Sequence, residues 1–299
     1  RRIVAERASP FANDPFFSQF FDFGPTAPRI QNALGSGVIL RKDGIVVTNF
    51  HVIGGADDIR AVLADGREFN GQVILADEGL DLAVIRLEGA GDLPALAIAN
   101  SDGAEVGDLV LAIGNPFGVG QTVSSGIVSG LARAGRGGGG TGGASRTRGY
   151  FIQTDAPINP GNSGGALVDI EGRLLGINTM ILSRSGGSNG IGFAIPANLV
   201  AQYVAQAEAG ATVFTRPWAG IDVQTVDADL AEALGLDRPG GVASRDMHPD
   251  SPFRAAGLTT GDVITAVAGQ PVNGPSELDY RLATLGPEAT AEITYHRDG

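Results

Sequence analysis

The chain has 299 residues, of which 33 are acidic and 21 are basic, so its formal charge at pH 7 is -12. Such a negative field argues against a nucleic-acid surface, because duplex phosphates would be repelled. The absence of cysteine excludes a disulfide framework, a thiol nucleophile and a thiolate zinc site. The three histidines are scattered without metal-ligand spacing, so we expect neither a metal nor another cofactor.

Glycine and proline are abundant, at 46 and 16 residues, whereas only 6% of the chain is aromatic. This composition is typical of many turns and short strands, and the length favours two compact domains. We therefore expect an all-β dominated fold with little helix. The chain starts at Arg1 and has no apolar run of the ~20 residues that a membrane span requires, so we expect that a signal or anchor segment has been removed. We also expect the last domain to be truncated after the alternating stretch 291–296.

Residues 1–30 form a Pro-punctuated segment whose aromatic side chains lack a partner strand nearby in the sequence. Large apolar side chains of this kind must be buried, either against another copy of the chain or against the following domain. We favour contacts between copies and treat residues 1–30 as an oligomerisation segment. The side chains expected at these contacts are Phe16, Phe17, Phe20 and Phe21.

Residues 31–212 read as a succession of short strands separated by turn signals such as Asp65-Gly66 and Glu171-Gly172. This rhythm favours antiparallel barrels over alternating strands and helices. A helix is predicted from Pro196 to about Ala209, where it closes the first domain. The glycine-rich tract 134–149 is too polar to pack a core and is predicted to be a mobile surface loop.

Residues 213–299 form the second predicted domain, a smaller α+β domain with Gly-Leu and Gly-Asp turns and one helix over 276–285.

Ser163 lies in the sequence Gly-Asn-Ser-Gly-Gly over 161–165, and such glycines allow a sharp turn that presents backbone N–H groups to an oxyanion. The same five residues also match the nucleophile elbow of α/β-hydrolases, in which a helix follows the serine. Here the pattern after the serine is a hairpin, with apolar runs at 166–168 and 174–177 around a Glu-Gly turn. The elbow is therefore disfavoured.

Among the histidines and aspartates, His51 and Asp81 have the surrounding sequence most typical of an active site, because each lies at one end of a predicted strand. Both precede Ser163 in the chain. His51 is expected at the end of a strand over 46–50, and Asp81 at the start of a strand over 81–85. Each residue alone has an ordinary structural explanation, such as a hydrogen-bonded histidine or a turn-capping aspartate. Together, in the order His, Asp, Ser, they predict a catalytic triad for acyl transfer.

Seven short motifs are spread over almost everything after the amino-terminal segment, at 35–39, 48–52, 81–84, 114–118, 153–156, 161–165 and 190–196. In these motifs the chain resembles the HtrA/DegP family of serine proteases. The resemblance implies two six-stranded barrels with the triad between them, as in chymotrypsin-like enzymes, and an oxyanion hole built from the backbone amides of Gly161, Asn162 and Ser163.

By family analogy, Ile158, Ile181 or Leu182, and Ile191 would shape the primary specificity pocket. None of these side chains is charged, so a small or β-branched aliphatic residue is expected at the cleavage position.

The second domain resembles a PDZ domain of the circularly permuted bacterial kind. Trp218, Ala219, Gly220 and Ile221 look like its carboxylate-binding loop and the strand to which a peptide adds, with the helix 276–285 as the other wall. Trp218 alone could equally complete a small core.

The expected protein is an ATP-independent periplasmic serine endopeptidase that degrades unfolded or damaged envelope proteins and binds carboxyl-terminal peptides through its PDZ domain. The resemblance also implies a homotrimer. The alternative is a non-hydrolytic chaperone or adaptor in which both domains only bind exposed chain segments; intact triad contexts count against it. The tract 134–149 stands where the family has its sensor loop. The contacts that this loop makes in relatives therefore cannot be assigned to individual residues of this chain.

Overall fold

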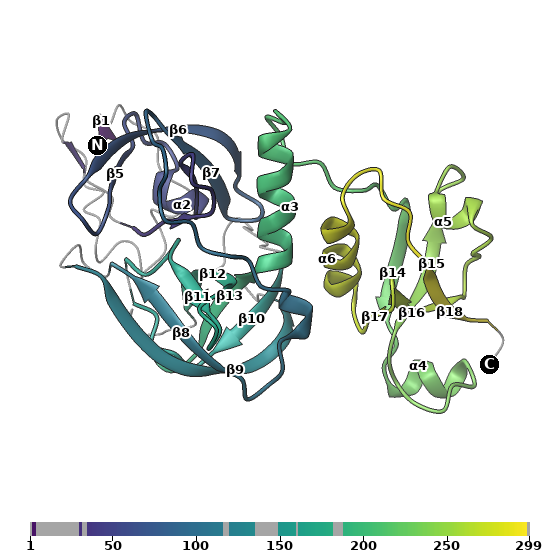
Figure 1. Ribbon diagram of the computed structural model, residues 1–299. Helices are drawn as coiled ribbons and strands as arrows, with labels where there is room; N and C mark the ends of the chain where they lie inside the picture. The colour runs from purple at the N-terminus through teal and green to yellow at the C-terminus, as the bar shows by residue number, and fades with distance from the viewer. Residues whose placement is uncertain are drawn as a thin grey trace. The chain divides into compact units, whose positions relative to one another are not determined.

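The computed structural model describes residues 2–3, 30–31, 35–115, 120–134, 149–159, 161–181 and 188–297. The chain divides into two compact units, Arg1–Phe214 and Thr215–Gly299 (Figure 1). At the amino-terminal end the backbone of β1 (Arg2–Ile3) pairs with that of β2 (Ile30–Gln31). The sequence predictions for the glycine-rich tract and for Phe16, Phe17, Phe20 and Phe21 fall outside the described residues.

A five-stranded antiparallel sheet forms the first half of unit 1. Its strand β4, next to the central strand β7, is a run of Val, Ile and Thr that is buried along its whole length, as expected of β-branched residues between two covered faces. Val46, Ile85 and Leu93 contribute to the core beneath it. The strand order is β3 (Val38–Ile39), β4 (Ile45–Thr48), β7 (Leu82–Leu87), β6 (Glu68–Asp77) and β5 (Arg60–Val62).

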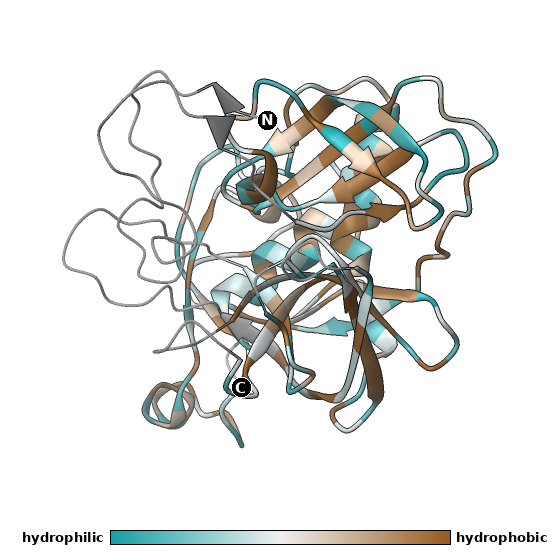
Figure 2. Cartoon of the chain, turned by 90° about the vertical axis from the view of Figure 1, so that its left-hand side faces the viewer, coloured by the Kyte–Doolittle hydropathy of each residue, from teal (hydrophilic) through white to brown (hydrophobic). Residues whose placement is uncertain are grey.

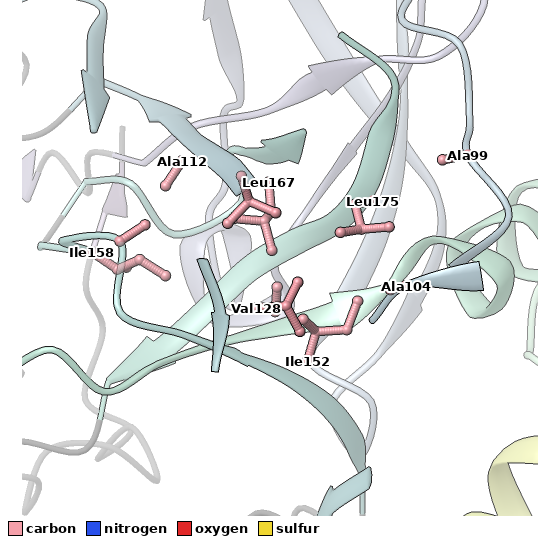
Figure 3. Close-up of a cluster of buried hydrophobic side chains, with 11 residues drawn as sticks. Ala99, Ala104, Ala112, Val128, Ile152, Ile158, Leu167 and Leu175 are labelled. Atoms are coloured by element: carbon pink, nitrogen blue, oxygen red, sulfur yellow. The ribbon is translucent and has the colours of Figure 1, made fainter. Parts of the chain in front are cut away.

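A closed six-stranded barrel forms the second half of unit 1. Alternating side chains of its strands fill the interior, with Val128, Ile152 and Leu167 almost fully buried (Figure 3). The hairpin predicted after Ser163 is confirmed by the pairing of β11 with β12. Around the barrel the strands are β10 (Tyr150–Thr154), β13 (Gly192–Pro196), β12 (Leu174–Ile181), β11 (Ala166–Val168), β8 (Leu109–Gly114) and β9 (Thr122–Ala134).

The predicted helix at the end of unit 1 is confirmed as α3 (Ala197–Glu208), with Pro196 at its N-cap. Its apolar face contacts strands of both halves, β7 on one side and β12 and β13 on the other. The Tyr203 ring packs on Phe214 at 5.0 Å, and its hydroxyl donates to the Leu82 carbonyl at 3.4 Å. In Figure 2 the hydrophobic colour follows mainly the strands of unit 1, and the connecting loops are mostly hydrophilic.

Unit 2 is a small α+β domain in which β14 is an edge strand of the sheet. The predicted helix is observed one residue longer as α6 (Pro275–Leu285) and packs its leucines against β14 and β16. Two shorter helices, α4 (Ala228–Ala233) and α5 (Pro252–Ala255), complete the domain. The strands are β14 (Ile221–Thr225), β15 (Val242–Met247), β16 (Val263–Val267), β17 (Gln270–Pro271) and β18 (Ile293–His296).

The expected fold class, dominated by β-structure with a smaller α+β domain behind it, is thereby confirmed. Of the two six-stranded barrels that the resemblance implies, the described residues form the second as a closed barrel, whereas the first is a five-stranded sheet. Within the described residues, no helix is long and apolar enough to span a membrane.

Candidate active site

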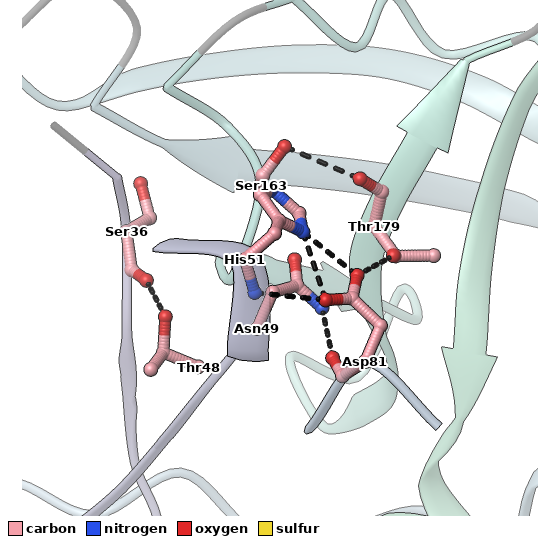
Figure 4. Close-up of polar contacts among 7 residues, drawn as sticks. All are labelled: Ser36, Thr48, Asn49, His51, Asp81, Ser163 and Thr179. Atoms are coloured by element: carbon pink, nitrogen blue, oxygen red, sulfur yellow. Dashed lines mark hydrogen bonds and ion pairs between the residues drawn. The ribbon is translucent and has the colours of Figure 1, made fainter. Parts of the chain in front are cut away.

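His51 and Asp81 are in direct contact beside the first sheet (Figure 4). The His51 Nδ1 lies 2.9 and 2.8 Å from the two carboxylate oxygens of Asp81, and the His51 backbone N–H donates to Oδ1 at 3.0 Å. Both side chains are mostly buried, with 9% and 13% exposed. Because an ionised carboxylate only accepts, Nδ1 carries the proton of the neutral ring and Nε2 is left as the basic nitrogen.

The local backbone around this pair differs from the sequence prediction in one respect. The predicted strand over 46–50 ends at Thr48, so His51 lies in the short helix α2 (Phe50–Ile53) instead of at a strand end. Asp81 comes directly before β7, in the left-handed conformation with a φ of 55°. Both residues are therefore placed by the turns that follow or precede buried strands.

Thr179, on β12 of the barrel, connects Asp81 to Ser163. Its hydroxyl donates to Asp81 Oδ2 at 2.5 Å, and its carbonyl accepts from Ser163 Oγ at 3.2 Å. A second donor, Asn49 Nδ2, holds the Asp81 carbonyl at 2.8 Å. Figure 4 shows Thr179 beside Ser163 and Asp81, with a dashed line to each. The structure thus brings the three predicted triad residues together from the sheet and from the barrel.

The nucleophile loop turns sharply at two glycines with left-handed φ values, Gly161 at 98° and Gly164 at 81°. The Asn162 N–H donates to the Asn159 carbonyl at 3.0 Å, inside the loop. A Cβ atom at Gly164 would collide with neighbouring backbone and with a threonine hydroxyl, so only glycine fits there. Ser163 itself is 9% exposed.

Of the residues expected to shape the specificity pocket, Ile158 and Ile181 lie at the core of the barrel. Ile158 is 2% exposed and belongs to the barrel core, against which Ile181 packs. A Cβ atom at Gly192 would lie only 2.7 Å from Ile158 Cδ1, so Ile158 packs directly over this glycine, next to the half-buried Ile191. Leu182 lies outside the described residues.

In unit 2, the stretch 218–221 forms a loop that leads into β14. Gly220 adopts a φ of 57°, and its carbonyl accepts from the His248 N–H at 2.8 Å. The buried Ser251 hydroxyl donates to the Ala219 carbonyl at 2.7 Å. The Trp218 ring is 57% exposed and meets the His248 ring edge-on at 5.2 Å, so it does not complete a core in this unit.

Sequence reasoning missed the polar residues that hold the triad in place. Thr179, Asn49 and Ser36 all make hydrogen bonds to the triad residues or to the nucleophile loop, but none of them was singled out by its chemistry. Ser36 and Asn49 do lie within motifs that carry the family resemblance, which is the only signal that could have found them.

Two family models match the chain in succession. A trypsin-like peptidase domain matches residues 35–177, and a PDZ domain matches residues 219–299.

Curated relatives match almost the whole chain. It is 44% identical over 297 residues to a "Probable periplasmic serine protease do/HhoA-like" of Haemophilus influenzae, covering 99% of this chain and 62% of the relative. It is 43% identical over 288 residues to the "Periplasmic pH-dependent serine endoprotease DegQ" of Escherichia coli, covering 95% of this chain and 61% of the relative. The chain therefore spans about three fifths of the length of these relatives.

Solved structures match over most of both chains. The structure named "HtrA-type protease AlgW with decapeptide" has a TM-score of 0.67 and 42% identity, covering 99% of this chain and 89% of that chain. The serine endoprotease from Yersinia pestis has a TM-score of 0.56 and 34% identity, covering 88% of this chain and 84% of that chain.

The fold and the site define a trypsin-like peptidase domain followed by a PDZ domain. The chain belongs to the HtrA/DegP family of serine proteases, as its sequence motifs predicted.

Proposed function

We propose that this chain is an ATP-independent serine endopeptidase of the periplasm that cuts unfolded or damaged polypeptides by acyl transfer. The observation that carries the proposal is the contact of His51 with both carboxylate oxygens of Asp81, with Thr179 joining this pair to Ser163. The periplasmic proteases among its relatives support the compartment and the reaction class.

The proposed mechanism assigns one role to each triad residue. His51 Nε2 accepts the proton of Ser163 Oγ as the hydroxyl attacks the scissile carbonyl, and later returns it to the leaving amine. In the resting arrangement the hydroxyl donates to the Thr179 carbonyl, so it must exchange this partner for His51 as the reaction starts. Asp81 stabilises the imidazolium that forms, and water then hydrolyses the Ser163 ester.

We assign the oxyanion to the backbone amides of Gly161 and Ser163. Of the three amides expected from the family resemblance, that of Asn162 donates to the Asn159 carbonyl within the loop. Preorganised N–H donors stabilise the negative charge of the tetrahedral intermediate, and removing one such donor typically costs about 10² to 10³ in kcat.

We propose that Ile158, Ile181, Leu182 and Ile191 shape an apolar primary pocket that takes a small or β-branched aliphatic side chain. The packing of Ile158 against Gly192, next to Ile191, supports this assignment, because it places uncharged aliphatic side chains together.

We propose that unit 2 binds the carboxyl-terminal end of a polypeptide as an added strand along β14. In the described residues β14 pairs with β15 alone, so its other edge keeps backbone groups available for a peptide. The loop residues Trp218 to Ile221 are fixed by His248 and Ser251, which preorganises them for a carboxylate.

We propose that the protein is a homotrimer whose contacts include Phe16, Phe17, Phe20 and Phe21. An exposed apolar strip on paired strands β8 and β9 offers a surface for another copy. Leu109 and Val123 are 63% and 55% exposed there, and the strand register places them on the same face of the barrel.

A serine-directed phosphonate probe tests the enzymatic assignment. The full chain is incubated with the probe in the presence of an unfolded substrate, and the adduct is located by mass spectrometry. Labelling at Ser163, absent in the Ser163→Ala variant, is expected. A folded wild-type protein that binds the substrate but leaves Ser163 unlabelled would favour the chaperone or adaptor function instead.

A further inference from the structure

Ser36, which lies just before β3, connects the first sheet to the nucleophile loop of the barrel. Its backbone N–H donates to the Ser163 carbonyl at 2.9 Å, and its hydroxyl donates to the Gly161 carbonyl at 2.6 Å. Both ends of the three-residue stretch that contains the nucleophile are therefore held by one residue from the other half of unit 1.

The direction of the Ser36 hydroxyl is set by its neighbours. The Asn115 N–H donates to Ser36 Oγ at 2.8 Å. A hydroxyl has one proton and two lone pairs, and an amide N–H can only donate, so the proton of Ser36 is free to point at Gly161. Thr48 Oγ1 also donates to the Ser36 carbonyl at 2.6 Å and fixes its backbone (Figure 4). The hydroxyl is thus already oriented before any substrate binds.

Two glycines allow this close approach. A Cβ atom at Gly164 would collide with the Ser36 carbonyl and the Thr48 hydroxyl. A Cβ atom at Gly114 would lie 3.0 Å from Ser36 Oγ and 2.6 Å from Asn162 Oδ1. Gly164 therefore allows the close approach at the Ser36 carbonyl, and Gly114 allows it at the Ser36 hydroxyl.

We propose that the Ser36 hydroxyl is a positioning group for the oxyanion hole, an inference that rests on the proposed function. Gly161 has no Cβ atom to restrict its ψ angle, so its own side chain does not fix the peptide plane that follows it. The bond from Ser36 fixes the Gly161 carbonyl, and the bond to the Ser163 carbonyl fixes the other end of the loop. These two bonds fix the peptide planes on either side of the Asn162–Ser163 peptide, so the Ser163 N–H between them is held in place without Ser36 touching a reacting atom.

The test compares Ser36→Ala with Ser36→Thr, which keeps the hydroxyl, on a short chromogenic peptide. In the alanine variant kcat is expected to fall about tenfold to a hundredfold at unchanged KM, because a small misplacement of oxyanion donors weakens transition-state binding. The inhibition constant of a peptide boronate is expected to rise by the same factor, since its tetrahedral adduct uses the same hole. The threonine variant is expected to recover most of the loss.

Thr265→Val is the matched control, because it removes another hydroxyl-to-carbonyl bond, to Thr294, in unit 2. An alanine variant with the wild-type kcat overturns the proposal, as does a loss of kcat with no change in boronate affinity. If the alanine variant fails to fold, Ser36→Cys replaces it. Its weaker donor is expected to give an intermediate kcat, and a wild-type kcat there overturns the proposal equally. Phosphonate labelling of the wild-type protein is carried out in parallel. If Ser163 is labelled, the proposed function stands and a negative result with the Ser36 variants counts against the positioning role alone.

Discussion

Thr179 is the residue on which the geometry of the candidate triad depends most directly. It is 3% exposed and contacts Asp81 through its hydroxyl and Ser163 through its carbonyl. Burying a carboxylate is costly unless it is hydrogen-bonded, and Asp81 accepts hydrogen bonds from the Thr179 hydroxyl and from the ring and backbone of His51. Loss of the Thr179 hydroxyl would remove one of the hydrogen bonds that hold the Asp81 carboxylate in position.

We expect Thr179→Val to lower kcat/KM about tenfold to a hundredfold with little change in fold. A hydrogen bond to a charged group contributes about 1.5 to 3 kcal/mol, and about 1.4 kcal/mol corresponds to a factor of ten in rate. Steady-state kinetics on a short chromogenic peptide measures the effect. Thr179→Ser, which keeps the hydroxyl, serves as the control and is expected to stay close to wild type. Wild-type activity in the valine variant would show that the bond from Thr179 is dispensable.

At the scale of elements, unit 2 contains an ion pair that joins the start of β16 to the end of β18. Asp262 is 1% exposed and accepts from Arg297 Nε and Nη2, both at 2.7 Å. The Thr259 N–H donates to the same carboxylate at 2.6 Å. The hydrogen bond from Arg297, followed by that from Thr259, holds the pKa of Asp262 below its ordinary value despite burial.

This lowered pKa predicts how the stability of unit 2 depends on pH. Because the folded-state pKa lies below the unfolded value of about 3.9, the stabilisation is fully present above that value. It is lost as the pH falls through the folded-state pKa. We expect Asp262→Asn to lower the free energy of unfolding at pH 7 by about 2 kcal/mol, and the difference from wild type to shrink at acidic pH.

Urea unfolding followed by the fluorescence of Trp218, the single tryptophan of the chain, measures this effect in unit 2. The exposed Asp237 provides a matched control, since Asp237→Asn removes the same charge from the surface. A difference between Asp262→Asn and wild type that stays constant down to pH 2 would contradict the assignment.

At the scale of the whole molecule, assembly depends on the amino-terminal segment in our proposal. We expect a form that starts at Gln31 to have a molar mass in solution below that of a trimer, because the phenylalanines of residues 1–30 are removed. Static light scattering measures the mass. Leu109→Gln, a polar replacement on the exposed strip of β8, tests the second surface independently. An unchanged mass after the deletion would refute the contacts assigned to the phenylalanines.

The two units are also expected to be coupled in function. We predict that a free peptide with an apolar carboxyl-terminal residue binds unit 2 and raises cleavage of a short chromogenic peptide by unit 1. A coupling free energy of about 1 to 3 kcal/mol, roughly 5- to 150-fold, is the ordinary range for such an effect. The same peptide with a carboxyl-terminal amide is the control, because it lacks the carboxylate that the loop 218–221 is proposed to bind.

The short substrate distinguishes coupling from simple tethering. A unit that only tethers would lower the apparent KM for long substrates and leave the turnover of a short one unchanged. Binding of the free peptide without a change in rate would therefore rule out coupling and leave tethering. Absence of binding would rule out both.

The sequence alone was sufficient for those features that are encoded locally. The strands, the hairpin after Ser163 and the helix over 197–208 follow from short-range alternation, turn residues and apolar periodicity. The candidate triad residues were predicted because each lies in a short motif of its own, and because their order along the chain is typical of such a triad. The sequence predicted His51 at the end of a strand, but it lies in the helix α2. A short apolar run does not show whether its last residues continue a strand or begin a helix.

The tertiary structure decided which polar groups hold these residues in place. Thr179 reaches Asp81 across 98 positions of the sequence, and Ser36 reaches Gly161 across 125. No local pattern marks such contacts, because a serine or threonine hydroxyl can bond to its own backbone, to water or to a distant carbonyl with similar free energy. Only the packing of the first sheet against the barrel brings these hydroxyls to Asp81 and to the nucleophile loop, and so fixes the geometry on which the proposed chemistry depends.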